Sequence, residues 1–339
     1  MRPVSDDSAA RAGRSASRLG RVARGFLRPS TRSRYVAVAR QRIGTALSRA
    51  PLEVCVVCAS RAARVLTVTQ ATSGDGGPAS GRTLRMRVCR SCGHVDNREN
   101  VHDYRSYERL EALPDRPRIG TADRKGREFH MAAMAIDILG RNDLEVLVFG
   151  AGRSFDNHHI AALPQVRHVA IADVMKLRDD AEFIDANLLA PRRFAVVVAS
   201  EVVEHFLDPR HDFAQLLGFV EPGGILVCST NLYDGGNLAT QRYAFLGGHT
   251  SYYSAGSIAL LAEANGYRLD LRTPLVATGY GGQRKRYLIL STSEAVMAAT
   301  ARYFSTRRYA PSESPTADQE LAEARRTQAA AADAVTRGG

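Results

Sequence analysis

Apolar runs of strand length alternate with segments of helical periodicity between residues 125 and 291. Helical patterns predict helices over 127–140, 154–162, 175–180, 209–219 and 255–265. Buried strands that alternate with helices predict a parallel α/β sheet with right-handed crossovers. The runs that we interpret as strands are EVLVF (145–149), RHVAIA (167–172), EFI (182–184), FAVVVA (194–199), GGILVCS (223–229), YRLDLR (267–272) and RYLILS (286–291).

The last two predicted strands, 267–272 and 286–291, are joined by TPLVATGYGGQRK without a helical segment. Two strands joined in this way can pair as an antiparallel hairpin at one edge of the sheet. The pattern therefore predicts a Rossmann-like, seven-stranded, doubly wound sheet of the α/β class with an antiparallel edge hairpin.

A different pattern precedes residue 125, where RVLTVT (64–69) and TLRMRV (83–88) alternate like hairpin strands around a glycine-rich loop. Each of these runs lies beside a CxxC pair, and two such turns supply the four thiolates of a closed tetrahedral zinc site. We therefore predict a zinc ribbon that binds one structural Zn²⁺. A disulfide or a redox dithiol is the alternative. The four predicted ligands are Cys55, Cys58, Cys89 and Cys92.

The stretch VLVFGAGRS (146–154) ends the first strand of the predicted sheet on Gly150 and Gly152. Ligands bind at the carboxyl ends of such strands, and the lack of side chains lets the backbone approach one. A helix that begins near Ser154 would point its free amides at a carboxylate or phosphate. Asp173 ends the next strand, where an acid can accept hydrogen bonds from both ribose hydroxyls. A helix N-cap is the alternative role for Asp173.

Residues 125–291 resemble a class I S-adenosylmethionine-dependent methyltransferase. The resemblance is carried in order by VLVFGAGRS, IADV, FAVVVASEVVEHFLDP (194–209), EPGGILVCST (221–230) and HTSYYSAGSIALLAEANGYRL (249–269). It implies S-adenosylmethionine as the cofactor and an adenine contact for Asp185. The residues that it places against the cofactor are Phe149, Gly150, Gly152, Ser154, Asp173, Asp185, Ser200 and Glu201.

Two positions depart from the family pattern D-x-G-x-G-x-G. Val148 occupies the position of the acid, and Ser154 occupies the position of the third glycine. The missing carboxylate normally engages the ammonium group of the cofactor. Reduced cofactor affinity and a degenerate site are the two interpretations. Asp173 and Asp185 favour retained binding.

Methyl transfer needs an acceptor placed in line and a group that removes its proton. His205 in EVVEH and His249 in GGHTSYY are the candidate bases, both expected at the open end of the sheet. His249 is favoured because it follows the glycine-rich loop DGGNLATQRYAFLGG, where an acceptor would enter. The alternative for each histidine is a structural hydrogen bond to loop backbone. Tyr252 and Tyr253 are expected either to wall the pocket or to pack in the core.

Charge is concentrated at the N-terminus, where residues 1–50 carry twelve arginines against Asp6 and Asp7, a net charge of +10 out of +11 for the whole chain. The rest is nearly neutral, so we expect no specific nucleic-acid partner. A disordered tail, a basic amphipathic helix in weak contact with an anionic surface, and a transit peptide all fit this segment. No run approaches the ~18 apolar residues of a membrane span, and we predict a cytoplasmic protein.

The predicted activity is transfer of a methyl group to a small-molecule or carbohydrate-linked acceptor. The four-cysteine module also resembles the zinc-binding domain that precedes the methyltransferase core in some sugar C-methyltransferases. A nicotinamide-dependent dehydrogenase is disfavoured, since GAGRSF lacks the third glycine of GxGxxG. A non-catalytic zinc-ribbon protein with a vestigial methyltransferase fold is the other alternative. The predicted organisation is a basic tail (1–50), a zinc-ribbon-like module (51–105), a linker (106–124), the methyltransferase domain (125–291) and an Ala-rich tail (292–339).

Overall fold

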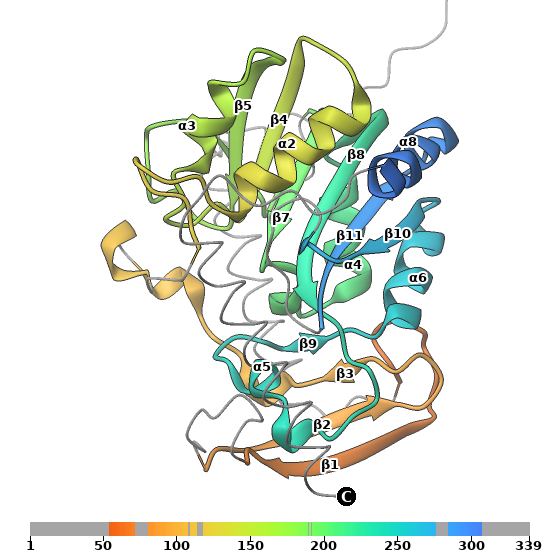
Figure 1. The fold of residues 1–339 in the computed structure, drawn as a ribbon. Coiled ribbons are helices and arrows are strands. Elements are labelled where there is room, and N and C mark those ends of the chain that lie inside the picture. Colours follow the sequence, from red (N-terminus) through yellow and green to blue (C-terminus); the bar gives the residue numbers. More distant parts are fainter. Residues whose placement is uncertain are drawn as a thin grey trace, which may run out of the picture. The chain divides into compact units, whose positions relative to one another are not determined.

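The computed structural model describes residues 54–71, 81–107, 109–113, 118–188, 190, 192–275 and 284–306 (Figure 1). The predicted basic tail over residues 1–50 lies outside the described residues. The part of the predicted C-terminal tail that follows residue 306 lies outside them as well.

A seven-stranded sheet in the order β10-β11-β8-β7-β4-β5-β6 forms the centre of the α/β region (Figure 1). The strands β6, β5, β4, β7 and β8 are parallel to one another, whereas β11 pairs antiparallel with both β8 and β10. The predicted doubly wound sheet with an antiparallel edge hairpin is therefore confirmed. Its strands are β4 (Leu144–Phe149), β5 (Val166–Asp173), β6 (Glu182–Asp185), β7 (Phe194–Ser200), β8 (Val220–Asn231), β10 (Arg268–Arg272) and β11 (Lys285–Ser291).

Helices cover both faces of this sheet, which explains why its central strands are continuously apolar. All seven residues of β7 are buried. On one face the core includes side chains of α2 (Arg127–Leu139), α3 (Asp156–Ala161) and α8 (Glu294–Thr306). On the other face it includes α4 (Pro209–Leu217) and α6 (Ala255–Ala264), as Figure 1 shows. Buried apolar area on two faces is the main source of stability for such a sheet.

Helix α8 lies within the segment that we assigned to the C-terminal tail. Val296 is 8% exposed, and Tyr303 and Phe304 pack against the same core cluster as α2. The guanidinium of Arg272 lies 5.0 Å from the centre of the Phe304 ring. Residues 294–306 thus cover an end of the sheet face that α2 leaves open.

The predicted helix over residues 175–180 is wrong, since the chain is irregular there. The segment buries no apolar face fully: Met175 and Leu177 are only partly buried, and Arg178 and Asp180 are held by polar contacts instead. A short helix without such a face is marginal on its own. The helix predicted over 154–162 is also shorter, being limited to α3.

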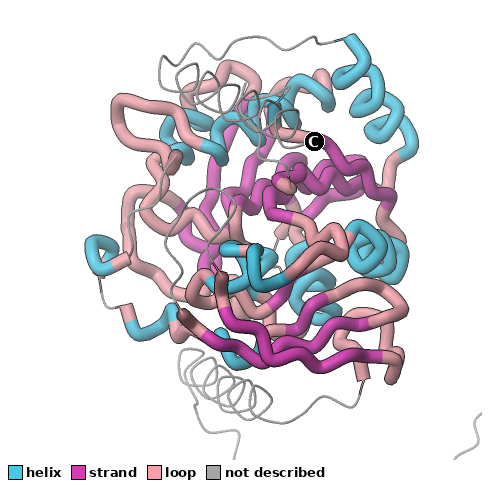
Figure 2. The backbone as a smooth tube through the Cα atoms, turned by 60° about the horizontal axis from the view of Figure 1, so that its bottom comes forward, coloured by secondary structure: helices cyan, strands magenta, loops and turns pink. Residues whose placement is uncertain are grey.

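A second, four-stranded sheet contains the cysteine-flanked hairpin (Figure 2). Its order is β1-β2-β3-β9, and every neighbouring pair is antiparallel. The last strand, β9, comes from the methyltransferase-like region and pairs Val95 with Tyr252, both buried. Its strands are β1 (Ala63–Thr69), β2 (Thr83–Cys89), β3 (Val95–Asp96) and β9 (Ser251–Tyr252).

Short helices lie in the loops between these elements. Among the helices that the structure describes, none combines the length and apolar character needed to span a membrane. The short helices are η1 (Arg98–Asn100), η2 (Tyr104–Ser106), η3 (Leu110–Ala112), η4 (Val203–His205), η5 (Leu238–Thr240) and α5 (Arg242–Phe245).

Candidate functional site

The glycine turn after β4 has a left-handed backbone, with φ of 71° at Gly150 and 51° at Gly152. A Cβ added at Gly150 would lie 2.5 Å from Cγ2 of Val202, so the close approach of the segment after β7 requires glycine. At Gly152 no described atom lies within 4 Å of an added Cβ. The backbone of Gly152 therefore borders open space that a ligand could occupy.

Asp173 lies beside this turn, at the carboxyl end of β5. Its Oδ1 accepts a hydrogen bond from the amide of Val174 at 2.7 Å, and its Oδ2 lies 3.4 Å from the amide of Gly152. Burial raises the pKa of Asp173 above its ordinary value. No helix begins at Asp173 in the described chain, so the N-cap alternative is wrong.

Asp185 is paired with Asp173 in the parallel register of β5 and β6. Its Oδ1 accepts hydrogen bonds from the backbone amide of Asn187 at 2.9 Å and from the Asn187 side chain at 2.6 Å. Two carboxylates therefore stand next to each other at the same edge of the sheet. We call Gly150, Gly152, Asp173 and Asp185 the cofactor edge.

Arg178 supports the cofactor edge and was not found by sequence reasoning. Its guanidinium donates to the carbonyl oxygen of Ser154 at 2.6 Å and to that of Gly152 at 3.4 Å, and its side chain is only 9% exposed. Because residues 175–180 were expected to be helical, nothing in the sequence directed this side chain back to the glycine turn.

Ser154 is engaged within the protein rather than facing open space. Its hydroxyl donates to Oε2 of Glu128 at 3.0 Å, and its amide donates to Ala151 at 2.9 Å. Burial raises the pKa of Glu128 to about 8. Helix α3 begins after Ser154 and has only six residues, so the expected anion site at its start lacks support. This geometry therefore gives no support to the predicted contact between Ser154 and a cofactor.

Polar residues gather where β7 and β8 end. Ser200 and Ser229 are 3.1 Å apart through their hydroxyls, and Ser229 donates to Glu201 at 3.0 Å. Glu201 also forms an ion pair with Lys285. Burial alone would raise the pKa of Glu201, but Lys285 and Arg127 lower it below its ordinary value. Glu201 has a φ of 56°, a strained conformation for a residue other than glycine.

Glu204 is fully buried one turn further along the chain. The Tyr243 hydroxyl donates to its Oε1 at 2.5 Å, and the Thr230 hydroxyl donates to its Oε2 at 3.4 Å. Burial, reinforced by the neighbouring Glu201, raises the pKa of Glu204 to about 8.

The two predicted bases come together beside Glu204. The ring centres of His205 and His249 are 4.9 Å apart, and the Tyr243 ring lies 4.3 Å from that of His249. Nδ1 of His205 lies 2.8 Å from the carbonyl oxygen of Gly248 and 3.1 Å from the hydroxyl of Tyr104. We call Tyr104, His205, Tyr243 and His249 the acceptor cluster. Sequence reasoning found the histidines and missed both tyrosines.

Glu204, His205 and His249 also offer ligand atoms within 4.8 Å of one another, which raises the question of a metal. Both carboxylate oxygens of Glu204 already accept hydrogen bonds, and Nδ1 of His205 is paired with loop backbone. The arrangement is that of a hydrogen-bonded network. The backbone contact of His205 agrees with the structural role considered for it.

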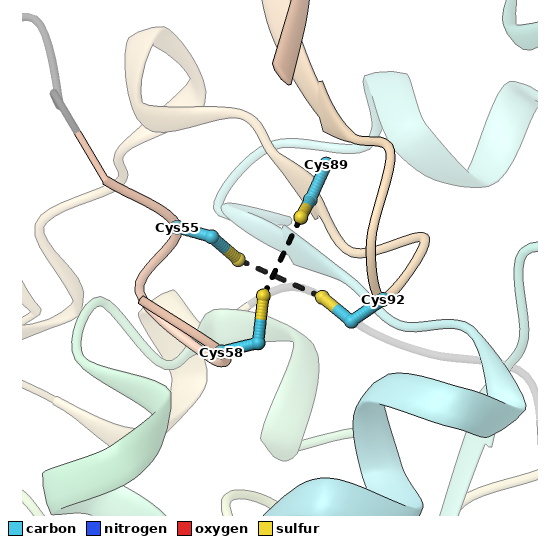
Figure 3. Close-up of side chains that lie close together, drawn as sticks. All are labelled: Cys55, Cys58, Cys89 and Cys92. Carbon is cyan, nitrogen blue, oxygen red and sulfur yellow. Dashed lines mark hydrogen bonds between the residues drawn. The ribbon is translucent and has the colours of Figure 1, made fainter. Parts of the chain in front are cut away.

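The cysteine pairs converge on one point, with all four Sγ atoms within 4.8 Å of one another (Figure 3). The short distances run between the two pairs, 3.6 Å from Cys55 to Cys92 and 3.5 Å from Cys58 to Cys89. Zn–S bonds of about 2.3 Å place tetrahedral sulfurs roughly 3.8 Å apart, whereas a disulfide needs about 2.05 Å. The cysteines are free thiols whose spacing fits a zinc ion.

The cluster offers one cysteine in the thiolate form that binds zinc. A hydrogen bond with the Cys92 thiol lowers the pKa of Cys55 to about 5, whereas the same hydrogen bond raises the pKa of Cys92, and burial raises that of Cys58. His94 lies nearby but packs against the Tyr253 ring with centres 5.1 Å apart. Burial lowers the pKa of His94 to about 3, so this ring is neutral.

A family model described as a methyltransferase domain matches residues 98–271, slightly more than half of the chain. The chain belongs to this methyltransferase-domain family. The match begins before residue 125, where we placed the start of the domain, and the methyltransferase domain so defined includes Tyr104 as well as both histidines.

Solved structures similar to the methyltransferase domain share little sequence with it. A 1,6-didemethyltoxoflavin-N1-methyltransferase from Burkholderia thailandensis, solved with 1,6-didemethyltoxoflavin and S-adenosylhomocysteine, is 18% identical over 48% of this chain and 78% of that one, with a TM-score of 0.37. Mitomycin 7-O-methyltransferase is 17% identical over 49% and 53%, with a TM-score of 0.40. An S-adenosylmethionine-dependent methyltransferase from Clostridium acetobutylicum is 9% identical over 49% and 92%, with a TM-score of 0.36. No curated protein matches the sequence.

Proposed function

We propose that the protein is an S-adenosylmethionine-dependent methyltransferase that acts on a small-molecule acceptor. One observation carries the proposal: in a chain of the methyltransferase-domain family, Asp173 lies against the amide of Gly152 at the open edge of the sheet. An acid next to a glycine turn at this place suits a nucleoside whose ribose hydroxyls donate to the carboxylate. Membership of this family favours methyl transfer over the hydride transfer of a dehydrogenase.

The cofactor edge would hold the nucleoside. Asp173 accepts hydrogen bonds from the ribose, Asp185 lies one strand further along for the adenine, and the bare backbone of Gly152 allows close approach. Phe149, Ser200 and Glu201 are proposed to complete this side, since they lie where β4 and β7 end. The bound cofactor would supply an electrophilic methyl group on its sulfonium.

The acceptor cluster would bind the second substrate and remove its proton. We assign general-base chemistry to His249, with His205 as the second candidate. His249 is only 6% exposed, and its amide donates to the carbonyl oxygen of Leu246 at 3.1 Å. A group that reaches this ring must be small or must protrude from a larger molecule, which supports a small-molecule acceptor. A carbohydrate-linked acceptor is the finer part of the proposal and depends on the resemblance of the four-cysteine module.

The four-cysteine cluster would bind one structural Zn²⁺, because its thiols have the number and spacing of a closed tetrahedral shell. We keep two further proposals that depend on sequence alone, namely a cytoplasmic location and weak contact of the basic residues 1–50 with anionic surfaces.

A non-catalytic protein with a vestigial fold is the competing function, and Val148 is the feature that raised it. Val148 is fully buried in the core beneath α2, so in this chain the position packs the sheet. Only a binding measurement separates a weak cofactor site from none.

Calorimetry of the full chain with S-adenosylmethionine and S-adenosylhomocysteine tests the proposal. Asp173→Ala should weaken binding about 10- to 100-fold, since each hydrogen bond to a charged group contributes ~1.5–3 kcal/mol. Asp270→Ala is the matched control, because Asp270 forms an ion pair with Arg272 within β10, on the far edge strand of the sheet. Absence of binding by the wild type at millimolar concentration would leave the vestigial fold as the better interpretation. If the wild type does bind, labelled cofactor added with cell extract would identify the acceptor.

A further inference from the structure

Two buried asparagines connect the segment after the second cysteine pair to the loop that carries His249. Asn97 and Asn100 are each 1% exposed. Nδ2 of Asn97 donates to the carbonyl oxygen of Ala244 at 2.7 Å and to that of His249 at 3.0 Å. Nδ2 of Asn100 donates to Leu246 at 2.6 Å and to His249 at 3.2 Å. Both amides thus converge on the same stretch of backbone.

The orientation of both side-chain amides follows from these contacts. A reversed amide would place its oxygen against carbonyl oxygens, which repel it. In the present orientation, Oδ1 of Asn97 and Oδ1 of Asn100 are buried and have no hydrogen-bond partner among the described residues. An unpaired buried amide oxygen opposes folding. The hydrogen bonds donated to the carbonyl oxygens of Ala244, Leu246 and His249 oppose this cost, and each of them holds the loop in place.

Backbone hydrogen bonds strengthen the same attachment. The amide of Asn97 donates to Thr250 at 2.8 Å, and the carbonyl oxygen of Asn100 accepts from Gly248 at 2.9 Å. His249 is thereby held on both sides and at its own carbonyl. Without these bonds the loop would have considerable freedom, since it contains Gly247 and Gly248 and lies outside regular secondary structure.

We propose that Asn97 and Asn100 are positioning residues that hold the His249 imidazole in place to accept a proton. The proposal rests on the proposed function, in which His249 is the general base. A base works only within hydrogen-bond reach of the proton it removes, so a small displacement of its backbone weakens catalysis. The asparagines touch neither substrate in this scheme and act only through His249.

The test uses Asn97→Ala and Asn100→Ala in the full chain, with Asn265→Ala as the matched control. Asn265 also donates from Nδ2 to a backbone carbonyl oxygen, that of Leu261 at 2.7 Å, but at the end of α6. The primary readout is NMR of histidine-labelled protein, with the His249 signals assigned by their loss in His249→Gln. The neighbouring Tyr243 ring should give His249 a shifted resonance and a nuclear Overhauser effect.

Both asparagine variants should move the His249 resonance and remove its Overhauser effect to Tyr243. The signals of His94, which packs against Tyr253, should stay unchanged as an internal reference. Affinity for S-adenosylhomocysteine should stay within about twofold, and transfer to the acceptor should show a kcat roughly 10- to 100-fold lower with the cofactor KM unchanged.

Unchanged His249 signals in both variants would overturn the proposal, as would an equal change in Asn265→Ala. If an alanine variant loses the His94 signals too and so fails to fold, Asn97→Ser and Asn100→Ser take its place, and the same criteria apply to them. Failure of the wild type to bind S-adenosylhomocysteine would instead count against the proposed function, because the NMR readout needs no cofactor.

Discussion

The cofactor edge and the acceptor cluster are built in different ways. The cofactor edge draws its residues from three consecutive strands and the turns that follow them, between residues 150 and 185. The acceptor cluster joins side chains from distant parts of the chain, and Tyr104 and His205 alone are 101 positions apart. Ligand sites that follow from local topology can be predicted from spacing, whereas sites assembled by tertiary contacts need the structure.

Loss of zinc should have the largest effect, because it should disrupt the small sheet and leave the cofactor edge intact. Cys89→Ser should reduce metal content from about one zinc per chain to nearly none and unfold the small sheet, because zinc binding contributes ~10–16 kcal/mol in such modules. Affinity for S-adenosylhomocysteine should change only a few-fold, since the cofactor edge shares no strand with that sheet. Metal analysis and calorimetry measure the two effects.

Ser91→Ala is the control for the cysteine variant, since Ser91 lies between Cys89 and Cys92 and contributes no thiol. Wild-type protein without zinc, prepared under reducing conditions without chelators, would refute the metal site. A large loss of cofactor affinity in Cys89→Ser would show that the cofactor edge depends on the small sheet, although the two share no strand.

Removal of the proposed general base should affect only the acceptor side. His249→Ala should lower the rate of methyl transfer about 10²- to 10⁴-fold, since a positioned base contributes that much. Cofactor affinity should remain within about twofold. Transfer of labelled methyl to the identified acceptor measures the first effect, and calorimetry measures the second. Full turnover in His249→Ala combined with loss in His205→Ala would assign the base to His205.

A side chain at the glycine turn should affect only the cofactor side. Gly150→Val should weaken binding of S-adenosylhomocysteine by about 100-fold or more, because the new Cβ lies 2.5 Å from Val202 and the φ of 71° disfavours branched residues. Gly266→Val is the matched control, since Gly266 has a φ of 73° and no described atom near an added Cβ. Equal affinity in both variants, measured by calorimetry, would mean that the turn tolerates displacement.

The smallest expected effect is a pH dependence of stability that comes from Glu128, which accepts a hydrogen bond from Ser154 next to the glycine turn. Burial raises the pKa of Glu128 to about 8 from an ordinary value of 4.5. The native chain therefore keeps a proton that the unfolded chain has lost, and the free energy of unfolding falls as the pH rises between these values. Glu128→Gln removes this titration. Between pH 5.5 and 8, the Tm of the wild type should therefore fall by about 4 °C or more beyond the fall seen for the variant.

Thermal unfolding across this pH range measures the effect, with exposed Glu263→Gln as the control. Identical pH dependence in wild type and Glu128→Gln would show that this carboxyl titrates normally. Glu204, whose pKa is raised to about 8 by burial and by Glu201, contributes a similar dependence that remains in the variant.

Much of the sheet could be predicted because its signals are local. FAVVVA is apolar at every position since both faces of β7 are covered, and Gly150 and Asp173 lie where strand ends must lie. The cysteine pairs are equally local. The predicted helix over 175–180 failed because Arg178 is held by tertiary contacts that no periodicity records.

The acceptor cluster shows the opposite limit. Tyr104 was assigned to the cysteine module and Tyr243 to an irregular loop, and neither belongs to a motif. Both tyrosines join the cluster through tertiary contacts, Tyr104 with His205 and Tyr243 with His249. Strand β9 has two residues, too few to give an alternating pattern.

The closing of the small sheet by β9 sets an order of events during synthesis. Ser254, next to β9, donates to the carbonyl oxygen of Cys92 across 162 positions of sequence. The ribosome adds roughly 5–20 residues per second, so the cysteine hairpin emerges many seconds before the strand that covers its edge. An uncovered strand edge is open to pairing with other chains. Until β9 is made, the edge of β3 with Val95 is open to such pairing, and a chaperone that covers it would prevent association.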